Sequence, residues 1–261
     1  MRLCRFDDDQ LGWVADGHVH DVSRVLERLP ALRWPLPAGD PLIAALDELR
    51  APLAAEAGRA APIPLERVTL RSPVPRPGKI VAARRNRGES TSATPDLFLK
   101  ASSSVAGPGD GIRPPPLARP IECELELAVV IGPGSPQPAI AGYCLALDLA
   151  VGGDEDRGLR KSADTFCILG PWLTTLEEAP DPASITLELE VAGELRQRGR
   201  IADQPFAPAQ VVDYASRFVT LQPGDVILAG SPAPSSIVRP GEVLLSRSTG
   251  LGPMQTRVLD L

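Results

Sequence analysis

The sequence predicts a mixed, mainly β protein with few helices. The chain has 29 prolines and 23 glycines among 261 residues, so it is expected to turn often. Most of its apolar runs are short and end at Gly or Pro, as strands do. A clear helical spacing of apolar residues occurs in one run of the second half, residues 208–221.

The chain divides into two parts at a proline-rich run, PIPLERVTLRSPVPRPG. Before it, residues 1–20 carry short strand-like runs around the turns DDDQ and ADG, which predict a hairpin. Residues 21–62 read as partly helical. We therefore expect a small α+β N-terminal domain over residues 1–72 and a larger β-domain over residues 73–261.

The larger part contains a series of strand-like runs bounded by Gly or Pro, separated by the loop GPGDGIRPPP and by the helix. These runs are KIVAA, LFLK, LELAVVIG, IAGYCLALDLAV, ITLELEVAG, DVILAG and GEVLLSRSTG.

The composition argues against nucleic acid and membranes as partners of this protein. The formal net charge of −6 argues against a nucleic-acid-binding protein, which usually carries a basic face. No apolar run reaches the length of a membrane span, and no charged-then-apolar leader opens the chain, so we expect a cytoplasmic protein without a membrane partner. The four cysteines lack C-x-x-C spacing and are expected to be buried, reduced thiols.

Three glutamates alternate with apolar residues where one strand begins. Glu122, Glu124 and Glu126 share a face, because alternate residues of a strand point the same way. Like charges this close repel unless a cation or bound protons neutralise them. A hard divalent ion is one solution, and an exposed strand edge with solvated carboxylates is the other. Asp148 is the only charged residue in a second apolar run, and it too requires a partner.

Lysine is rare here. Only Lys79, Lys100 and Lys161 occur among the 27 basic residues. A position that remains Lys in an arginine-rich chain either needs a compact ammonium group or has kept it by chance.

Six ordered motifs resemble the fumarylacetoacetate hydrolase family, over most of the chain. They read KIVAA, LFLK, ELELAVVIG, GYCLALD, RKSADTFCILGPW and TLQPGDVILAGSP. The resemblance implies that the larger domain has the β-sandwich roll of that family's C-terminal domain and that the protein forms a homodimer.

The resemblance also implies a divalent metal ion, Mg²⁺ or else Mn²⁺ or Ca²⁺, bound by Glu124, Glu126 and Asp148. It gives Lys161 a catalytic role beside the metal and the substrate, and implicates Lys100 in binding the substrate. That substrate would be a small anionic 2-oxo or β-dicarbonyl compound, whose enolate the metal stabilises.

The chain departs from the family where a catalytic His is usual. The expected His position falls on Ser90 or its neighbour, and the only histidines, His18 and His20, lie far upstream in the predicted hairpin. Glu89 could replace the missing base if it is buried. Gly152 and Gly153 stand where the family often has Arg-Asp.

Other residues near this gap are expected to bind substrate. Arg85 and Arg87 would share a face if the first strand continues, and would suit a carboxylate or phosphate, although a solvated loop is an equal alternative. Asn86 matches the Asn of the family motif, and Ser231 keeps a hydroxyl in the family's G-T-P turn. Gln197 completes the predicted substrate-binding residues.

The predicted function is therefore that of a divalent-metal-dependent enzyme acting on a 2-oxo acid or β-dicarbonyl compound through an enolate. The reaction is left open between decarboxylation, isomerisation, C–C hydrolysis and a specialised biosynthetic step. Without the His, we expect weak or no hydrolysis of acylpyruvates. The alternative is a catalytically silent homologue that binds a metal or ligand.

Overall fold

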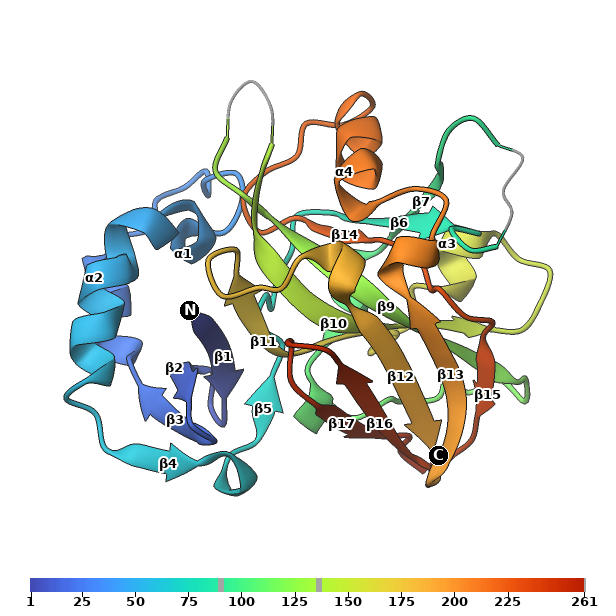
Figure 1. Ribbon diagram of the computed structural model, residues 1–261, viewed down its shortest axis with the longest axis horizontal. Helices are drawn as coiled ribbons and strands as arrows, with labels where there is room; N and C mark the ends of the chain where they lie inside the picture. Colours follow the sequence, from blue (N-terminus) through green and yellow to red (C-terminus); the bar gives the residue numbers. More distant parts are fainter. Residues whose placement is uncertain (89–91, 135–137, 261) are drawn as a thin grey trace.

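The computed structural model describes residues 1–88, 92–134 and 138–260. Within them the protein is mainly β, with one large sheet, one smaller sheet and four α-helices, which confirms the predicted fold class (Figure 1). No helix of the described residues is both long enough and apolar enough to span a membrane.

The large sheet is centred on two long antiparallel strands, β9 (Ile121–Gly132) and β10 (Ala139–Val151). On one side β10 pairs with β11, and on the other side β9 pairs with β14, which is followed by β6 and β7. The bounds of these and the smaller flanking strands are β6 Ile80–Arg84, β7 Asp96–Lys100, β8 Val105–Ala106, β11 Cys167–Thr175, β14 Val226–Leu228 and β15 Ser236–Val238.

A four-stranded antiparallel sheet packs over one face of the large sheet. Leu125 and Leu127 of β9 share a buried core with Leu187 and Leu189 of this second sheet, so the two layers form the expected sandwich (Figure 1). Its strands, in spatial order, are β13 (Glu194–Arg200), β12 (Thr186–Val191), β16 (Val243–Ser248) and β17 (Met254–Arg257).

The N-terminal strands continue the large sheet. The predicted hairpin is a three-stranded meander, and its first strand pairs antiparallel with β11, so that Leu3 lies opposite Leu173. The predicted boundary at residue 72 therefore divides one continuous sheet. The strands are β1 (Arg2–Phe6), β2 (Gln10–Ala15), β3 (His18–Asp21), β4 (Pro62–Pro64) and β5 (Leu70–Arg71).

The helices are short, and one of them packs against the large sheet. In the N-terminal part, Leu46, Leu49 and Leu53 of one helix pack into a core shared with the large sheet. The helix predicted over residues 208–221 is present with Pro in its first turn, but it ends earlier, at Ser216. The helices are α1 (Pro41–Ala44), α2 (Leu46–Ala57), α3 (Arg157–Arg160) and α4 (Pro208–Ser216). Short 3₁₀ segments are Ser23–Arg28, Leu65–Arg67, Ser102–Ser104, Pro108–Asp110, Pro182–Ser184 and Ile201–Asp203.

All four cysteines are buried and free, as predicted. Burial raises the pKa of the Cys4 and Cys167 thiols to about 12, which keeps both protonated at neutral pH.

The alternation of side chains along β9 positions the acidic residues. Ala128 and Val130 on its even-numbered face enter the core beneath the N-terminal helices. Glu122, Glu124 and Glu126 continue that same face toward the beginning of the strand, where they line a cavity. The apolar half of this face thus packs in the core, and the acidic half faces the cavity.

Candidate active site

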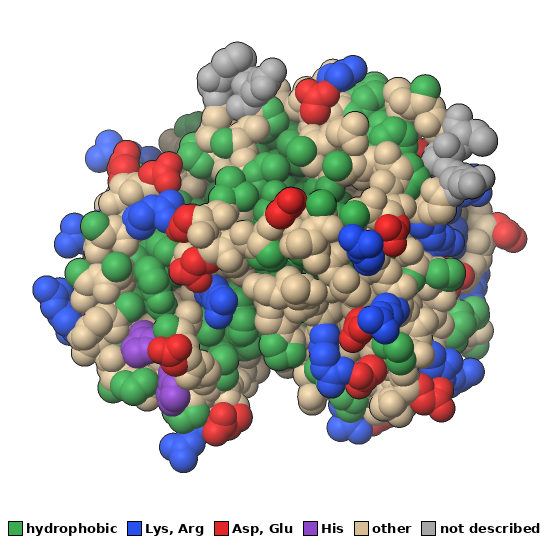
Figure 2. Space-filling model, viewed as in Figure 1, with side chains coloured by type: hydrophobic (Ala, Val, Ile, Leu, Met, Phe, Trp, Pro, Cys, Tyr) green, Lys and Arg blue, Asp and Glu red, His purple; other side chains and the backbone are tan. Residues whose placement is uncertain are grey.

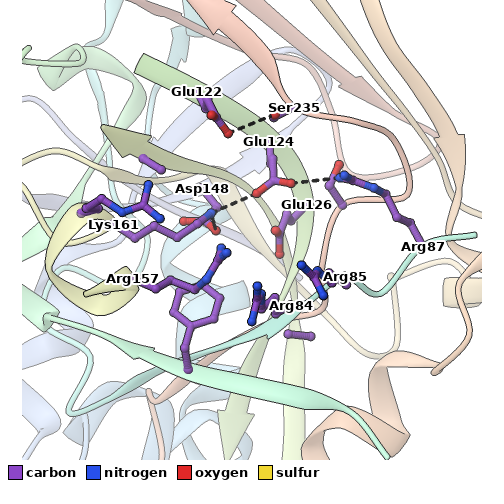
Figure 3. Close-up of a pocket in the computed structure, with 15 residues that line it drawn as sticks. Arg84, Arg85, Arg87, Glu122, Glu124, Glu126, Asp148, Arg157, Lys161 and Ser235 are labelled. Atoms are coloured by element: carbon purple, nitrogen blue, oxygen red, sulfur yellow. Dashed lines mark hydrogen bonds and ion pairs between the residues drawn. The ribbon is translucent and has the colours of Figure 1, made fainter. Parts of the chain in front are cut away.

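A cavity of about 240 Å³ opens at this acidic end of β9 and β10 (Figure 3). Among the described residues, its lining carries six basic and four acidic side chains. The basic residues are Arg84, Arg85, Arg87, Arg157, Arg160 and Lys161, and the acidic residues are Glu122, Glu124, Glu126 and Asp148. A small anion that also carries metal-binding oxygens would suit such a lining.

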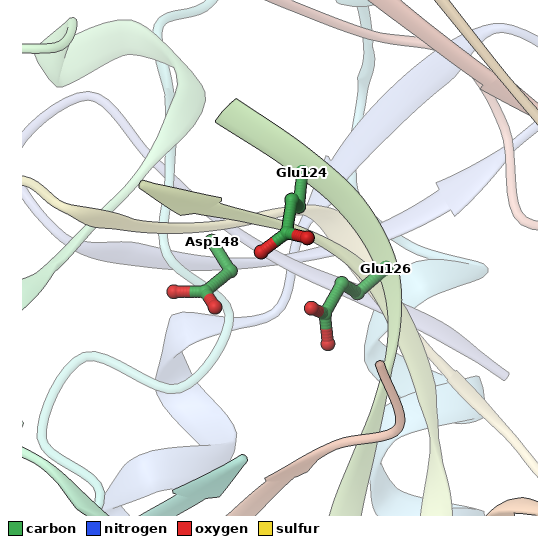
Figure 4. Close-up of side chains that lie close together, drawn as sticks. All are labelled: Glu124, Glu126 and Asp148. Carbon is green, nitrogen blue, oxygen red and sulfur yellow. The ribbon is translucent and has the colours of Figure 1, made fainter. Parts of the chain in front are cut away.

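Three of the acids converge. Asp148 of β10 lies directly opposite Glu124 in the antiparallel ladder, and Glu126 is two residues further along β9 on the same face. One carboxylate oxygen from each side chain lies within 4.8 Å of the other two (Figure 4). The strand register thus brings together the three residues expected to bind a divalent ion, and the distances suit oxygen ligands around one such ion.

The ionised form of Glu126 is costly, because the residue is only 2% exposed. Burial raises its pKa well above the usual value, and the nearby charges of Asp148 and Glu124 raise it further. The amide N–H of Gly230 donates to its Oε2 at 2.7 Å, and this hydrogen bond offsets only a small part of the rise in pKa. A bound divalent cation would favour the ionised carboxylate, so the donor set fits a metal such as Mg²⁺ or Mn²⁺.

Asp148 is 1% exposed but has two cationic partners. Burial alone would raise its pKa, yet the charges and hydrogen bonds of Lys100 and Lys161 outweigh burial and lower it. Lys100 donates to Oδ1 and Lys161 donates to Oδ2. Asp148 is therefore held ionised, in one orientation.

Lys161 lines the cavity and follows the last residue of α3. Its ammonium donates to Glu124 Oε2 at 2.9 Å as well as to Asp148, and lies 5.5 Å from the centre of the Phe98 ring. Burial alone would lower the pKa of Lys161, but the neighbouring carboxylates raise it. A charged ammonium thus lies beside the carboxylate cluster, and the catalytic role that the family resemblance implies for Lys161 stays a prediction.

Lys100 was expected to bind substrate, but it does not line the cavity. Its side chain is fully buried behind Asp148, and its ammonium also donates to the carbonyl oxygen of Phe166 at 2.8 Å. The structure therefore places Lys100 as a support for Asp148.

Arg85 and Arg87 both line the cavity, although not through the expected shared strand face. β6 ends at Arg84, and Arg85 adopts a left-handed backbone conformation with φ of 55°. Arg87 then reaches across to donate to Glu124 Oε1 at 3.2 Å. The strand alternation that predicted the pair fails here because the strand has already ended.

Asn86 and Gln197 lie outside the cavity and bind backbone. Asn86 donates to the carbonyl oxygens of Phe206 and Ala229, each at 2.8 Å, and so fastens the loop after β6. The Cβ atom of any larger residue at Gly230 would lie 2.7 Å from the Asn86 Cβ, which explains the glycine. The Gln197 amide accepts from Leu125 N at 3.0 Å and donates to Cys123 O at 2.7 Å, which ties β13 to β9.

The remaining predicted residues divide between the cavity and other parts of the chain. Ser231 lines the cavity, and its hydroxyl donates to Ala233 O. Glu89, the suggested replacement base, lies outside the described residues. His18 and His20 are on β3, where Figure 2 shows the histidine side chains over the N-terminal part. Neither lines the cavity.

Sequence reasoning missed Arg84, Arg157 and Arg160 as lining residues. A signal was present for Arg157, which precedes Lys161 by four residues, so a helix between them would put both on one face. Alternation puts Arg84 on the same face of β6 as Ile80 and Ala82, but the sequence alone does not tell that this face is the one that carries the acidic residues of β9.

Comparisons with known proteins agree with this geometry. A family model described as the C-terminal domain of fumarylacetoacetate (FAA) hydrolase matches residues 77–259. The chain is 39% identical to a maleylpyruvate hydrolase from Aquipseudomonas alcaligenes, over 97% of this chain and 98% of that protein. It is 32% identical to a mitochondrial oxaloacetate tautomerase from Rattus norvegicus, over 71% of this chain and 65% of that protein.

A solved structure shares the whole fold. It is a maleylpyruvate hydrolase from Sphingobium sp. SYK-6 in complex with manganese(II) and pyruvate, with a TM-score of 0.87 and 34% identity. The match covers 99% of both chains, so the N-terminal part is included as well as the larger β part.

Proposed function

Because the chain belongs to the fumarylacetoacetate hydrolase family, we propose that it hydrolyses a carbon–carbon bond of an acylpyruvate and releases pyruvate. The observation that carries this proposal is the convergence of Glu124, Glu126 and Asp148 beside Lys161 in a cationic cavity. The maleylpyruvate hydrolases similar to this chain over nearly its full length support hydrolysis, and one of them binds manganese and pyruvate.

The three carboxylates are the residues that would hold the divalent ion. When bound, such an ion supplies a Lewis acid that polarises the 2-oxo group of the substrate. Mg²⁺, Mn²⁺ and Ca²⁺ all accept carboxylate oxygens, and we favour Mg²⁺ or Mn²⁺ for this site.

Lys161 contributes a fixed positive charge. Its hydrogen bonds to Glu124 and Asp148 hold the ammonium at the cavity wall, where it offsets negative charge that develops on the substrate. Lys100, on the side of Asp148 away from the cavity, donates to Asp148 Oδ1 and so fixes the orientation of that carboxylate. Asn86 and Gln197 act through the backbone groups that they bind. Ser231, Arg85 and Arg87 line the cavity, which supports the proposal that they contact the substrate.

The reaction balances as a hydrolysis. The hydroxyl group of a water molecule bonds to the 4-oxo carbon, and the bond between carbons 3 and 4 breaks. The electron pair of that bond leaves with the pyruvate fragment as an enolate, which takes up a proton at carbon 3. The products are pyruvate and the carboxylic acid derived from the acyl group.

The water needs a base, and no histidine lines the cavity among the described residues. Glu89 stays our prediction for that base, because it follows Arg87 by only two residues in the chain. The sequence alone led us to expect weak hydrolysis. The likeness to maleylpyruvate hydrolases is the reason to place hydrolysis first.

Isomerisation or decarboxylation of a 2-oxo acid is the second candidate. The absence of a histidine from the described cavity lining favours it, since enolisation needs a carbonyl-polarising site and a proton donor but no activated water. The 32% identity with an oxaloacetate tautomerase points the same way.

The test measures pyruvate release. Purified protein, stripped with EDTA and reloaded with Mn²⁺ or Mg²⁺, is mixed with maleylpyruvate, and pyruvate is followed with lactate dehydrogenase. We expect metal-dependent release that Glu126→Gln abolishes. If oxaloacetate tautomerises or loses CO₂ while no acylpyruvate is cleaved, the second candidate replaces the first. If neither reaction occurs although metal binds, the protein is a silent homologue.

We further propose a cytoplasmic homodimer built mainly by the larger domain, residues 73–261. This proposal is based on the resemblance to the family and on the composition of the chain. Sedimentation velocity at micromolar concentration tests the oligomeric state, and a stable monomer would contradict it.

A further inference from the structure

Three guanidinium groups lie together on the side of the cavity that faces the carboxylates (Figure 3). They belong to Arg84 at the end of β6, to Arg85 just after it, and to Arg157 at the start of α3. We call these three residues the arginine wall. Two separate segments of the chain supply them.

The arginine wall differs from the other cations of the cavity in its partners. Arg87 and Lys161 donate to Glu124, and Arg160 donates to the backbone carbonyl groups of Val151 and Glu155. Within the described residues, by contrast, Arg85 and Arg157 form no hydrogen bond or ion pair. No described carboxylate therefore forms an ion pair with either guanidinium group.

Arg84 is only weakly engaged. Its terminal nitrogen lies 3.4 Å from Asp96 Oδ2, and the Asp96 side chain is 52% exposed. Its Nε is buried and has no hydrogen-bond partner among the residues that the structure describes. A buried donor without a partner costs free energy, and a carboxylate ligand could supply the missing acceptor.

Holding the three guanidinium groups together is unfavourable for both the backbone and the electrostatics. Arg85 holds a positive φ of 55°, which is unfavourable for a residue with a side chain. Arg157 packs over Phe98, with its guanidinium carbon 5.7 Å from the ring centre. Burial lowers the pKa of Arg157, and repulsion by Arg84 and Arg160 adds to the effect. An anion at this place would relieve the repulsion.

We propose that Arg84, Arg85 and Arg157 bind a second carboxylate of the substrate, distant from its 2-oxo acid end, and thereby select dicarboxylic acylpyruvates. This inference rests on the proposed function, in which the carboxylate cluster and Lys161 receive the 2-oxo acid end. Two charge centres on opposite sides of one small cavity match a substrate with an acid group at each end.

A selectivity assay tests the wall during turnover. Maleylpyruvate carries the distal carboxylate, whereas acetylpyruvate has the same 2,4-dioxo acid unit without it. We expect Arg157→Gln and Arg85→Gln each to lower kcat/KM for maleylpyruvate by about 10- to 100-fold, the loss typical of a charge-assisted hydrogen bond. For acetylpyruvate the loss should stay below about fivefold, so the selectivity ratio falls.

Two further variants control this assay. Arg239→Gln removes an exposed arginine outside the cavity and should leave the ratio at the wild-type value. Arg157→Lys keeps the charge but loses the planar fork, so it should recover only part of the selectivity. Equal losses for both substrates in the glutamine variants would overturn the inference and leave the proposed function standing.

A binding experiment tests the wall without turnover. The Mn²⁺-loaded protein is titrated calorimetrically with 2-oxoheptanedioate and with 2-oxoheptanoate, which differ only in a carboxylate or a methyl group at the far end. We expect the dicarboxylate to bind the wild type at least about tenfold more tightly, and the Arg85→Gln, Arg157→Gln double variant to lose that advantage.

The two experiments separate the possible failures. If no acylpyruvate is cleaved but the binding advantage exists and disappears in the double variant, the proposed function fails and the carboxylate subsite remains. If the wild type binds both 2-oxo acids equally, the arginine wall does not recognise a carboxylate and the inference is wrong.

Discussion

The ammonium group of Lys100 lies behind the carboxylate of Asp148 and donates to its Oδ1, with both side chains at most 1% exposed. Each charge of such a buried pair offsets the desolvation cost of the other, and either ion alone would be costly in the protein interior. Because Asp148 also belongs to the carboxylate cluster, this pair connects the stability of the sheet to the geometry of the site.

Replacing Lys100 with Met should strongly destabilise the protein. The change leaves Asp148 with one cationic partner instead of two, and removing one partner of a buried pair typically costs about 3–5 kcal/mol. Urea denaturation in EDTA measures the free energy of unfolding. Arg217→Met is the control, because Arg217 pairs with Asp213 where both side chains are exposed, and losing such a surface pair should cost less than about 1 kcal/mol.

A double variant identifies the cause of the Lys100 effect. Adding Asp148→Asn removes the buried negative charge that has lost one of its two cationic partners, so the double variant should be more stable than Lys100→Met alone. If Lys100→Met costs less than about 1 kcal/mol, the buried pair does not have the importance assigned to it.

Glu126→Gln should remove the stabilisation that a divalent ion gives. For the wild type, Mn²⁺ at a hundred times its dissociation constant should add about 2.7 kcal/mol to the free energy of unfolding. The variant should gain almost nothing, because one of three converging carboxylates is lost. Thermal unfolding with and without Mn²⁺ measures this, and Glu122→Gln, outside the cluster, should still respond.

The same variant has a second expected effect in EDTA. Burial and two neighbouring carboxylates raise the pKa of Glu126, so its ionised form destabilises the metal-free protein. Glu126→Gln should therefore be at least as stable as the wild type without metal. A clear loss of stability in EDTA would mean that the carboxylate has a structural role that no ion explains.

Gln197→Ala should affect folding rather than substrate binding. The change leaves the buried Leu125 amide without its acceptor and the Cys123 carbonyl without its donor, which costs about 1–3 kcal/mol. The Michaelis constant should stay within about twofold of the wild type at a temperature where the variant is folded. Gln255→Ala, at an exposed position of β17, is the control for stability. A large rise in the Michaelis constant alone would restore Gln197 to the substrate-binding residues.

Lys161→Met should lower kcat by about 100-fold or more, the scale of losing one group that stabilises developing charge. The reaction is followed both as pyruvate release and as proton exchange at carbon 3 of a 2-oxo acid by NMR. EDTA should abolish both signals in the wild type, and Mn²⁺ should restore them. Lys161→Arg should not rescue activity, since a planar fork cannot replace a compact ammonium between Glu124 and Asp148. Full activity in Lys161→Met would remove this residue from the mechanism.

The carboxylate cluster could be predicted because it depends on a local rule. Alternation along a strand puts Glu124 and Glu126 on one face from sequence alone, and the family resemblance supplied Asp148 on the neighbouring strand. The same rule failed for Arg85, whose left-handed backbone depends on how the chain leaves β6.

The positions of Asn86 and Gln197 could not be foreseen for a different reason. Their partners are backbone groups far away in the chain, such as Phe206 for Asn86 and Cys123 for Gln197. A motif preserves the residue type but does not say whether its hydrogen bonds go to a ligand or to the protein. The pairing of β1 with β11, across some 170 residues, was likewise invisible to local patterns.

Because β1 pairs with β11, cutting the chain at the expected boundary, residue 72, would remove a strand from the large sheet. Residues 73–261 on their own would expose the edge of β11, with its backbone donors and acceptors open beside apolar side chains such as Leu173. Open edges of this kind recruit strands from other molecules, so the fragment would tend to aggregate. The N-terminal strands therefore also protect the β11 edge from pairing with strands of other molecules, whatever part they take in catalysis.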